Sequence, residues 1–179
     1  MTDFKALQEE ILELSSQAAR FRRVVLHLHS PESYDFANTP DSDPALNNRD
    51  DYLGKNGEKL FLAHLDGAVD LISITDHMKS GYSHKVSNWA RENEYSIKVL
   101  PGIELNIRLQ PPLNTLRLHI LIIFPESKSL GEIERIIPSG KIPDDSNRTG
   151  KEEVDVQNLS EFIKNIRENH NRLCIRRYR

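Results

Sequence analysis

Leu71-Ile72-Ser73-Ile74-Thr75-Asp76-His77 is the stretch that decides the fold, because a short apolar run leads directly into a threonine, an aspartate and a histidine. A run of this length without helical spacing predicts a buried strand, here within residues 68–75. Comparable runs occupy residues 22–29, 97–100 and 116–124, and residues 173–175 begin another. Near-continuous apolar strands are typical of sheets that are covered by helices. The sequence therefore predicts an α/β fold with parallel strands, either as an open sheet or closed into a barrel.

Helical periodicity lies before and between these runs. Apolar residues recur at helical spacing over residues 1–20 and again over residues 156–169, which predicts two amphipathic helices. Shorter helices are predicted at residues 58–65, 84–94 and 131–137. Polar stretches are predicted to be loops at residues 31–57 and 141–153, and loops this long within a domain are commonly functional.

The composition is that of an ordinary soluble protein. The 179 residues suffice for one domain with a real core, 37% of them are hydrophobic and 28% are charged. The net charge of −3 argues against a general nucleic-acid-binding surface. A single cysteine, Cys174, excludes an internal disulfide and favours a reducing compartment. With neither a signal peptide nor a membrane-spanning run in the sequence, we expect a cytoplasmic protein without a membrane partner.

Histidines and carboxylates gather in or just after the predicted strands. His27 and His29 are two residues apart in a strand, so both imidazoles project from the same face and suit a divalent ion. The full set is His27, His29, Asp35, Asp76, His77, Glu104 and His119. Because the carboxyl ends of parallel strands meet at one edge of a sheet, we expect these side chains to converge there.

Each residue taken singly also has a purely structural interpretation. A histidine in a strand is usually a hydrogen-bonded core or surface residue, Asp76 would serve as a helix cap, and Glu104 as a solvated strand-end carboxylate. The joint pattern favours a metal site, because burying several uncompensated polar groups costs several kcal/mol unless they are paired or bind a metal.

The order of these motifs resembles the PHP (polymerase and histidinol phosphatase) family. The matching segments are His27-x-His29, Ile74-Thr75-Asp76-His77, Pro101-Gly102-Ile103-Glu104 and His119-Ile120-Leu121. The resemblance covers residues 23–124, with supporting helices to about residue 175. The segment 21–36 is similar to PHP domains that precede an ATPase region, which would be a partner region in a longer form.

The resemblance implies a distorted (β/α)7 barrel with up to three divalent ions, of zinc, manganese or iron, at its mouth. Carried over by position, the metal ligands are His27, His29, Asp35, His77, Glu104 and His119. The His-x-His pair would bind one ion, Glu104 would link it to a second that His119 also holds, and His77 with Asp35 would serve a third. Glu104 and Asp76 are the expected catalytic residues, Asp76 by orienting the site. The loop before Asp35 is one residue longer than the family pattern.

The implied reaction is hydrolysis of a phosphate ester, on a phosphorylated small molecule or a nucleic acid. The family's later ligands, a histidine on the next strand and an Asp-x-His, have no counterpart beyond His170. We therefore expect a partial domain over residues 21–175, an atypical basic tail over residues 176–179, and an incomplete barrel. Its open sheet edge would favour self-association.

Two other functions fit the same residues. A catalytically inactive metal-binding or regulatory module would keep the fold and lack the later ligands. An amidohydrolase-like enzyme also begins with His-x-His after its first strand, although Thr75-Asp76-His77 followed by Pro-Gly-Ile-Glu fits that class poorly.

Overall fold

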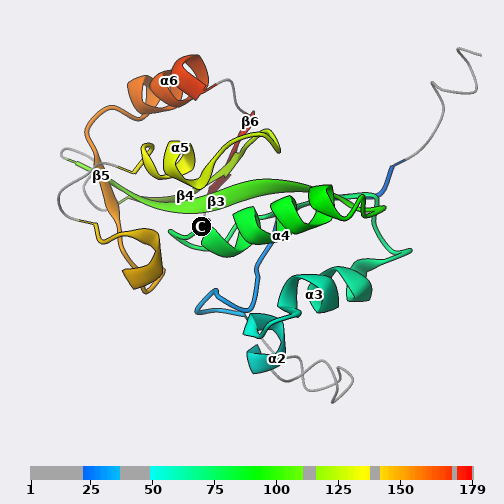
Figure 1. The fold of residues 1–179 in the computed structure, drawn as a ribbon. Coiled ribbons are helices and arrows are strands. Elements are labelled where there is room, and N and C mark those ends of the chain that lie inside the picture. Colours follow the sequence, from blue (N-terminus) through cyan, green and yellow to red (C-terminus); the bar gives the residue numbers. More distant parts are fainter. Residues whose placement is uncertain (1–21, 37–48, 111–115, 138–141, 171–172, 179) are drawn as a thin grey trace, which may run out of the picture.

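The computed structural model describes residues 22–36, 49–110, 116–137, 142–170 and 173–178 (Figure 1). The helix predicted over residues 1–20 lies outside the described residues. In chain order the elements are β1 (Val24–Leu28), α2 (Arg49–Leu53), α3 (Gly57–Leu65), β2 (Leu71–Ile74), α4 (Gly81–Glu92), β3 (Lys98–Leu109), β4 (Arg117–Ile123), α5 (Leu130–Glu134), the 3-10 helix η2 (Asp145–Asn147), β5 (Val154–Val156), α6 (Leu159–His170) and β6 (Leu173–Tyr178). None of the described helices has the length and apolar character needed to cross a membrane.

The strands form one mixed sheet in the order β1-β2-β3-β4-β6, with β5 paired to β3. Helices α2, α3 and α4 lie below the long strand β3 in Figure 1, and α5 and α6 lie above it. The predicted α/β class is therefore confirmed. Parallel pairing holds for β1, β2 and β3 and for β5 beside β3. It is wrong for β4, which runs antiparallel to both β3 and β6. The connection from β3 to β4 spans only residues 110–116, and a parallel crossover needs about a dozen residues or more.

Strand β3 is much longer than predicted, because it continues through Pro101 and Gly102 as far as Leu109. Pro101 has no N–H to donate, yet its carbonyl accepts a hydrogen bond from Phe124 N (2.8 Å). Gly102 lies so close to β2 that an added Cβ would be 2.8 Å from the Ile74 carbonyl oxygen. Proline and glycine commonly mark the end of a strand, and the predicted strand stopped at residue 100. Here the two residues allow β3 to lie close to β2, so Glu104 lies inside β3 rather than after it.

Three elements were not predicted from the sequence: α2, β5 and the short 3-10 helix η2, which lies within the expected loop of residues 141–153. Helix α2 lies within the expected loop of residues 31–57; it is too short to show periodicity, and buried Tyr52 packs there against Phe61. Strand β5 lies where the polar connector was expected to pass into a helix, and its pattern is buried, exposed, buried. The expected basic tail is in part a strand, since residues 176–178 belong to β6 and pair with β4.

Side chains alternate between the two faces of β3 and β4, so one face packs in the apolar core and the other carries residues of the candidate site. In β3 the side chains at 103, 105, 107 and 109 are buried in one apolar cluster with residues of α5 and α6, and in β4 those at 118, 120 and 122 join them. Because successive side chains of a strand point to opposite faces, Glu104, Asn106 and His119 project from the other face. Each fully buried leucine or isoleucine contributes about 1.5–3 kcal/mol. The face that carries the polar residues is thus held in place by a dense apolar layer behind it.

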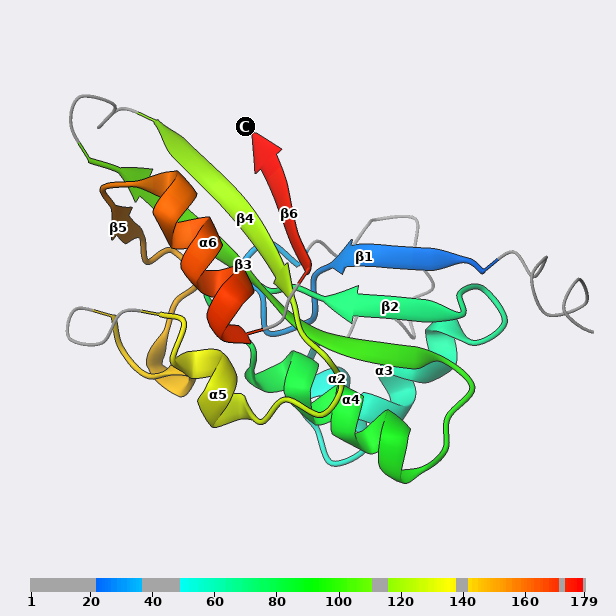
Figure 2. The same cartoon turned by 90° about the horizontal axis from the view of Figure 1, so that it is seen from above.

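A second apolar cluster joins β2 and the start of β3 to α2, α3 and α4. Figure 2 shows these helices beside β2 and β3, away from α6. Strand β1 adds Val25 and Leu28 to this cluster although they are three residues apart, because the pairing register with β2 shifts between them. Such an irregularity re-aims side chains, and it leaves His27 and His29 on the face opposite the cluster.

Candidate metal centre

The structure brings six of the predicted site residues together in one place. They come from five segments: β1 and its end (His27, His29), the following loop (Asp35), the residues after β2 (His77), β3 (Glu104) and β4 (His119). Neighbouring imidazole rings are 4.8–4.9 Å apart between centroids. The convergence is not at the carboxyl ends of all the strands, as we had expected, but alongside the middle of β3. The antiparallel direction of β4 places His119 opposite Asn106, two residues beyond Glu104.

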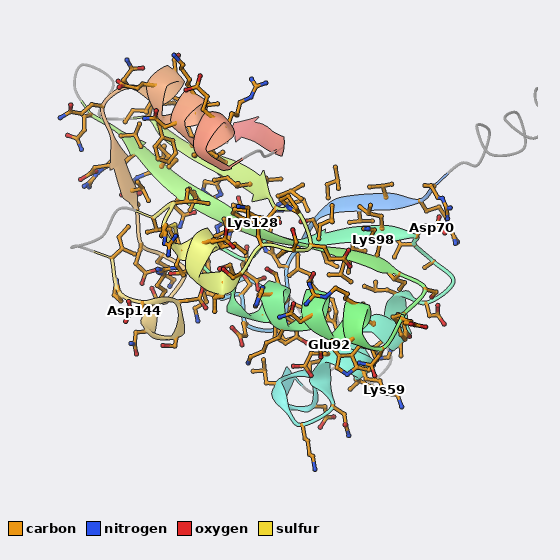
Figure 3. The ribbon with its side chains drawn as sticks, turned by 45° about the horizontal axis from the view of Figure 1, so that its top comes forward. Lys59, Asp70, Glu92, Lys98, Lys128 and Asp144 are labelled. Atoms are coloured by element: carbon orange, nitrogen blue, oxygen red, sulfur yellow. The ribbon has the colours of Figure 1, made fainter. Side chains whose placement is uncertain are left out.

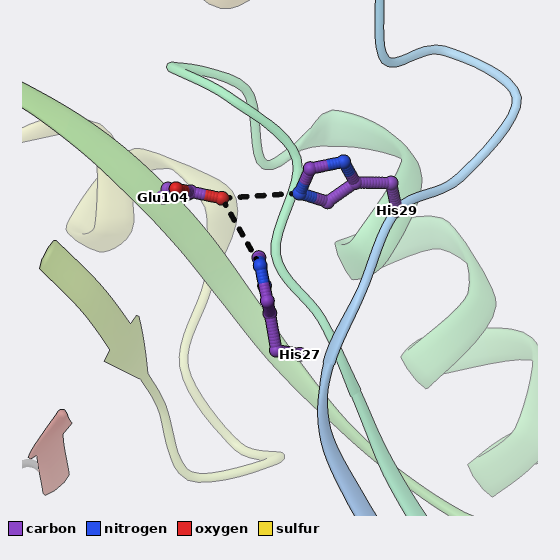
Figure 4. A group of neighbouring side chains, drawn as sticks. All are labelled: His27, His29 and Glu104. Atoms are coloured by element: carbon purple, nitrogen blue, oxygen red, sulfur yellow. Dashed lines mark hydrogen bonds and ion pairs between the residues drawn. The ribbon is translucent and has the colours of Figure 1, made fainter. Parts of the chain in front are cut away.

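Glu104 is the centre of the cluster. Its carboxylate is 2% exposed, and its Oε2 lies 3.0 Å from His29 Nε2 and 3.5 Å from His27 Nε2 (Figure 4). The same oxygen is 3.8 Å from His77 Nε2, while Oε1 lies 2.5 Å from His119 Nδ1. Burial alone would raise the pKa of this carboxyl, but the hydrogen bond from His29 and the neighbouring imidazoles lower it to about 2. Glu104 is therefore charged at neutral pH, and its two oxygens face different histidines.

His29 shows how strongly the cluster attracts positive charge. Its Nδ1 lies 2.8 Å from Asp35 Oδ1 and its Nε2 lies 3.0 Å from Glu104 Oε2, so each ring nitrogen faces a carboxylate oxygen. Burial alone lowers the pKa of His29, but the hydrogen bond to Glu104 and the two carboxylate charges raise it overall. For Asp35, burial favours the neutral acid, yet its hydrogen bond from Ser33 and the nearby imidazoles lower its pKa. Between each nitrogen of His29 and the carboxylate oxygen that it faces, a proton or a metal ion is therefore required.

Asn106 is a functional residue that sequence reasoning missed. Its Nδ2 donates to the carbonyl oxygens of Gly150 (2.9 Å) and Glu152 (3.0 Å), so the amide orientation is fixed and Oδ1 is left to accept. Oδ1 lies 3.0 Å from His77 Nδ1, which must therefore carry the proton. Its Nε2 faces Asp35 (3.2 Å) and Glu104 (3.8 Å), so this is the ring nitrogen that would be available to a metal ion. One feature of the sequence could have identified it: Asn106 is two residues from Glu104, and side chains two apart in a strand lie on the same face.

Unlike the six other predicted site residues, Asp76 belongs to none of the groups of described side chains that could hold a metal ion. Its carboxylate accepts hydrogen bonds from the backbone N (2.6 Å) and the hydroxyl (2.5 Å) of Ser30. Burial raises its pKa to about 6, although both bonds from Ser30 act in the other direction. Asp76 thus fixes the chain between His29 and Asp35, and its role is that of a positioning residue.

The backbone after β2 is bent sharply at the site. Met78 has φ 56°, a left-handed conformation that is costly for a residue with a side chain. Its N–H donates to the Glu104 carbonyl (2.8 Å), and the Glu104 N–H donates to the Asp76 carbonyl (2.9 Å). These two bonds extend the pairing of β2 with β3 past the last residue of β2. They hold His77 beside Glu104, where the two residues form an isolated parallel bridge.

Among the described residues, three groups of side chains are arranged to hold a metal ion, each with ligand atoms within 4.8 Å of one another. The groups are His27, His29 and Glu104; His29, Asp35 and His77; and His77, Glu104 and His119. Every two groups share one residue. Glu104 has two oxygens and can serve two ions at once, whereas one imidazole nitrogen binds one ion. Two ions linked through Glu104 are therefore compatible with the geometry, and Asp35 with His77 offers a third position.

The chemistry of the donor set fits such ions. Four imidazoles and two carboxylates form a mixed nitrogen and oxygen environment that suits zinc, manganese or iron. The carboxylate of Glu104 is buried among imidazoles, and a cation would satisfy all of these groups together. No protein-family model matches this chain, and neither does any curated protein sequence.

Proposed function

We propose that this protein is a metal-dependent phosphoesterase of the PHP type that hydrolyses a phosphate ester at the His/Glu centre. The observation that carries the proposal is the position of Glu104, whose two carboxylate oxygens lie between His27 and His29 on one side and His119 on the other. A carboxylate shared in this way is typical of sites that hold two ions for displacement at phosphorus. Divalent ions held there would neutralise charge on the phosphoryl oxygens and make a bound water acidic.

The chain's own residues prepare the site for that chemistry. Asn106 keeps His77 in the tautomer that presents Nε2. Thr75 Oγ1 lies 2.8 Å from His27 Nδ1, and this hydrogen bond holds the His27 ring in its orientation with Nε2 toward Glu104. Asp76 holds the loop that carries Asp35. Preorganised ligands avoid reorganisation when charge develops during the reaction, and this is a large part of enzymatic rate enhancement.

Metal reconstitution tests the proposal. The full chain is stripped with a chelator and then loaded separately with Zn²⁺, Mn²⁺ or Fe²⁺, and the metal content per chain is measured by elemental analysis. The loaded protein is assayed with p-nitrophenyl phosphate and bis(p-nitrophenyl) phosphate, one monoester and one diester. We expect at least two ions per chain and hydrolysis of at least one ester, lost again on chelation.

The His119→Ala variant separates the centre from a contaminating activity, with the exposed His64→Ala as a matched control in α3. Activity that survives in His119→Ala at the control's level would contradict the proposal. Stoichiometric metal binding without hydrolysis of either ester would instead support a metal-binding module that has no catalytic role.

A further inference from the structure

Arg148 is a buried arginine close to the metal centre, although it is not one of the candidate ligands. It lies directly after η2, and its side chain is 3% exposed. A buried guanidinium is costly unless its charge is paired and its N–H groups find acceptors. The partners of Arg148 come from three segments: helix α5, the segment around η2, and the turn after β2.

Two of these segments fix the guanidinium in place. Nη1 and Nη2 donate to the two carboxylate oxygens of Glu134, with 3.1 Å between Nη1 and Oε1. Nε donates to the Pro143 carbonyl (2.7 Å), and Asp145 Oδ1 lies 3.7 Å from Nη1. Paired hydrogen bonds to one carboxylate set the plane of a guanidinium as well as its position. The direction in which Nη1 donates is therefore fixed.

The third contact of Arg148 is with the turn that carries His77. Nη1 donates to the Met78 carbonyl (3.0 Å). Met78 is fully buried, and in the described part of the chain no backbone N–H donates to this carbonyl. Its φ of 56° is costly for a residue with a side chain, and such a conformation persists only where the surrounding contacts enforce it. Arg148 provides one of these contacts.

The turn at Met78 decides where His77 lies. On one side the Met78 N–H donates to the Glu104 carbonyl (2.8 Å), and on the other Arg148 holds the Met78 carbonyl. Asn106 orients the ring of His77, whereas Arg148 acts on the backbone next to it. His77 belongs to two of the three groups that could hold a metal ion, so a shift of this turn would disturb both.

We propose that Arg148 is a positioning residue of the metal centre, which raises the metal affinity of the two groups that contain His77 by holding the Met78 carbonyl. The inference rests on the metal binding in the proposed function, and not on hydrolysis. The third group, formed by the His-x-His pair and Glu104, lacks His77. An ion bound there is therefore an internal reference that Arg148 should leave unaffected.

Arg148→Lys tests this role, because an ammonium keeps the charge but cannot donate in the paired geometry of a guanidinium. The metal-free chain is titrated with Co²⁺ at a temperature at which circular dichroism shows it to be folded. The visible spectrum of Co²⁺ reports the ligand geometry of each ion as it binds. We expect one ion to bind as in the native chain, and the affinity for the next to fall about 10- to 100-fold with an altered spectrum.

The His77→Ala variant separates an effect through His77 from a general loss of stability. If Arg148 acts through His77, adding Arg148→Lys to His77→Ala should change the remaining Co²⁺ affinity by no more than about twofold, whereas independent effects would add. A purely structural role would lower the Tm of the metal-free chain without weakening one ion selectively.

Arg91→Lys is the matched control. Arg91 Nη1 also donates to a backbone carbonyl, that of Glu126 (3.1 Å), but Arg91 lies near the end of α4. Figure 3 shows the neighbouring Glu92 far from Asp144, which lies directly before η2. We expect native Co²⁺ binding in this variant.

Native affinity for every ion in Arg148→Lys, or an equal fall for all ions that persists beside His77→Ala, would overturn the role of Arg148 and leave the phosphoesterase proposal intact. A selective loss in Arg148→Lys, with no ester hydrolysed by the fully loaded native chain, would overturn the proposed function and leave the role of Arg148 standing. Failure of the native chain to bind Co²⁺ would overturn both.

Glu134→Gln replaces Arg148→Lys if the latter does not fold without metal. This variant keeps Arg148 but weakens its anchor, since one of the two carboxylate oxygens becomes an NH₂ group. We expect the same selective loss of Co²⁺ affinity, and native affinity for every ion would overturn the role of Arg148.

Discussion

Replacing Glu104 by Gln is the most informative single change, because this carboxylate belongs to two of the three ligand groups. The amide keeps the volume and length of the side chain, so no cavity forms in the sheet. It removes the charge and turns one of the two ligand oxygens into an NH₂ group. We expect the native chain to bind at least two ions and Glu104→Gln at most one, held by the group that contains Asp35. Hydrolysis of either test ester should fall below detection.

The magnitude follows from mass action. An ion present at one hundred times its dissociation constant stabilises a fold by about 2.7 kcal/mol, so two ions contribute about 5 kcal/mol. For a domain of this size that corresponds to a rise of roughly 10–20 °C in Tm on loading. In Glu104→Gln we expect at most half of that rise. The metal-free variant should keep the native circular dichroism spectrum, at a cost of about 1–3 kcal/mol for the hydrogen bonds that the amide cannot reproduce.

The assay is a thermal melt with and without metal, beside elemental analysis and the two ester assays. Glu92→Gln on the exposed surface of α4 is the control and should behave as the native chain. Binding of two ions by Glu104→Gln, with the full metal-induced rise in Tm, would refute the role of Glu104 in linking the two ions. Retained activity in a metal-loaded and correctly folded variant would refute it as well.

Three further predictions concern the surroundings of the centre. In Asn106→Leu, loss of the hydrogen bond that orients His77 should weaken zinc binding about 10- to 100-fold in a competition titration, and unchanged affinity would contradict that role. In Asp76→Asn, one of the two bonds from the loop after β1 is lost, and urea unfolding should show a loss of about 1–3 kcal/mol; a smaller loss in this variant than in an exposed Asp→Asn change would argue against it. In the metal-free chain, the raised pKa of His29 adds stability that is present below about pH 6.5 and lost as the pH rises. The pKa of Glu104, lowered to about 2, adds stability that is present above its usual value and lost as the pH falls toward 2. Melts across pH should therefore show a metal-free optimum between about pH 4.5 and 6.5, and a higher optimum with metal, since protons compete with metal for imidazole.

The sequence predicted the strands, and which side chains gather at one place, better than their arrangement. Apolar runs identify β1, β2 and β4 because burial on the helix-covered face leaves a direct trace in composition. The length of β3 was not predictable in the same way. Pro101 and Gly102 are local signals for a strand end, and only the close contact with β2 makes them suitable inside a strand.

In the candidate site too, some residues could be identified from the sequence and others could not. His27, His29, His77, Glu104 and His119 were identified because histidines and carboxylates in apolar runs are unusual. Asn106 was not identified, because a single asparagine in a strand is common in any sequence. Its role depends on contacts between β3 and the turn at residues 149–152, which lie more than forty positions apart along the chain.

The alternation along β3 has a consequence for how this protein can change. One face of the strand seals the apolar interior and the other supplies Glu104 and Asn106, so the two sets of side chains are locked in phase. Inserting or deleting one residue between Gly102 and Glu104 would exchange the faces, turning the carboxylate toward the interior and the leucines and isoleucines toward the metal centre. Substitutions can therefore tune the core and the site separately, but a change of length in this segment removes both at once.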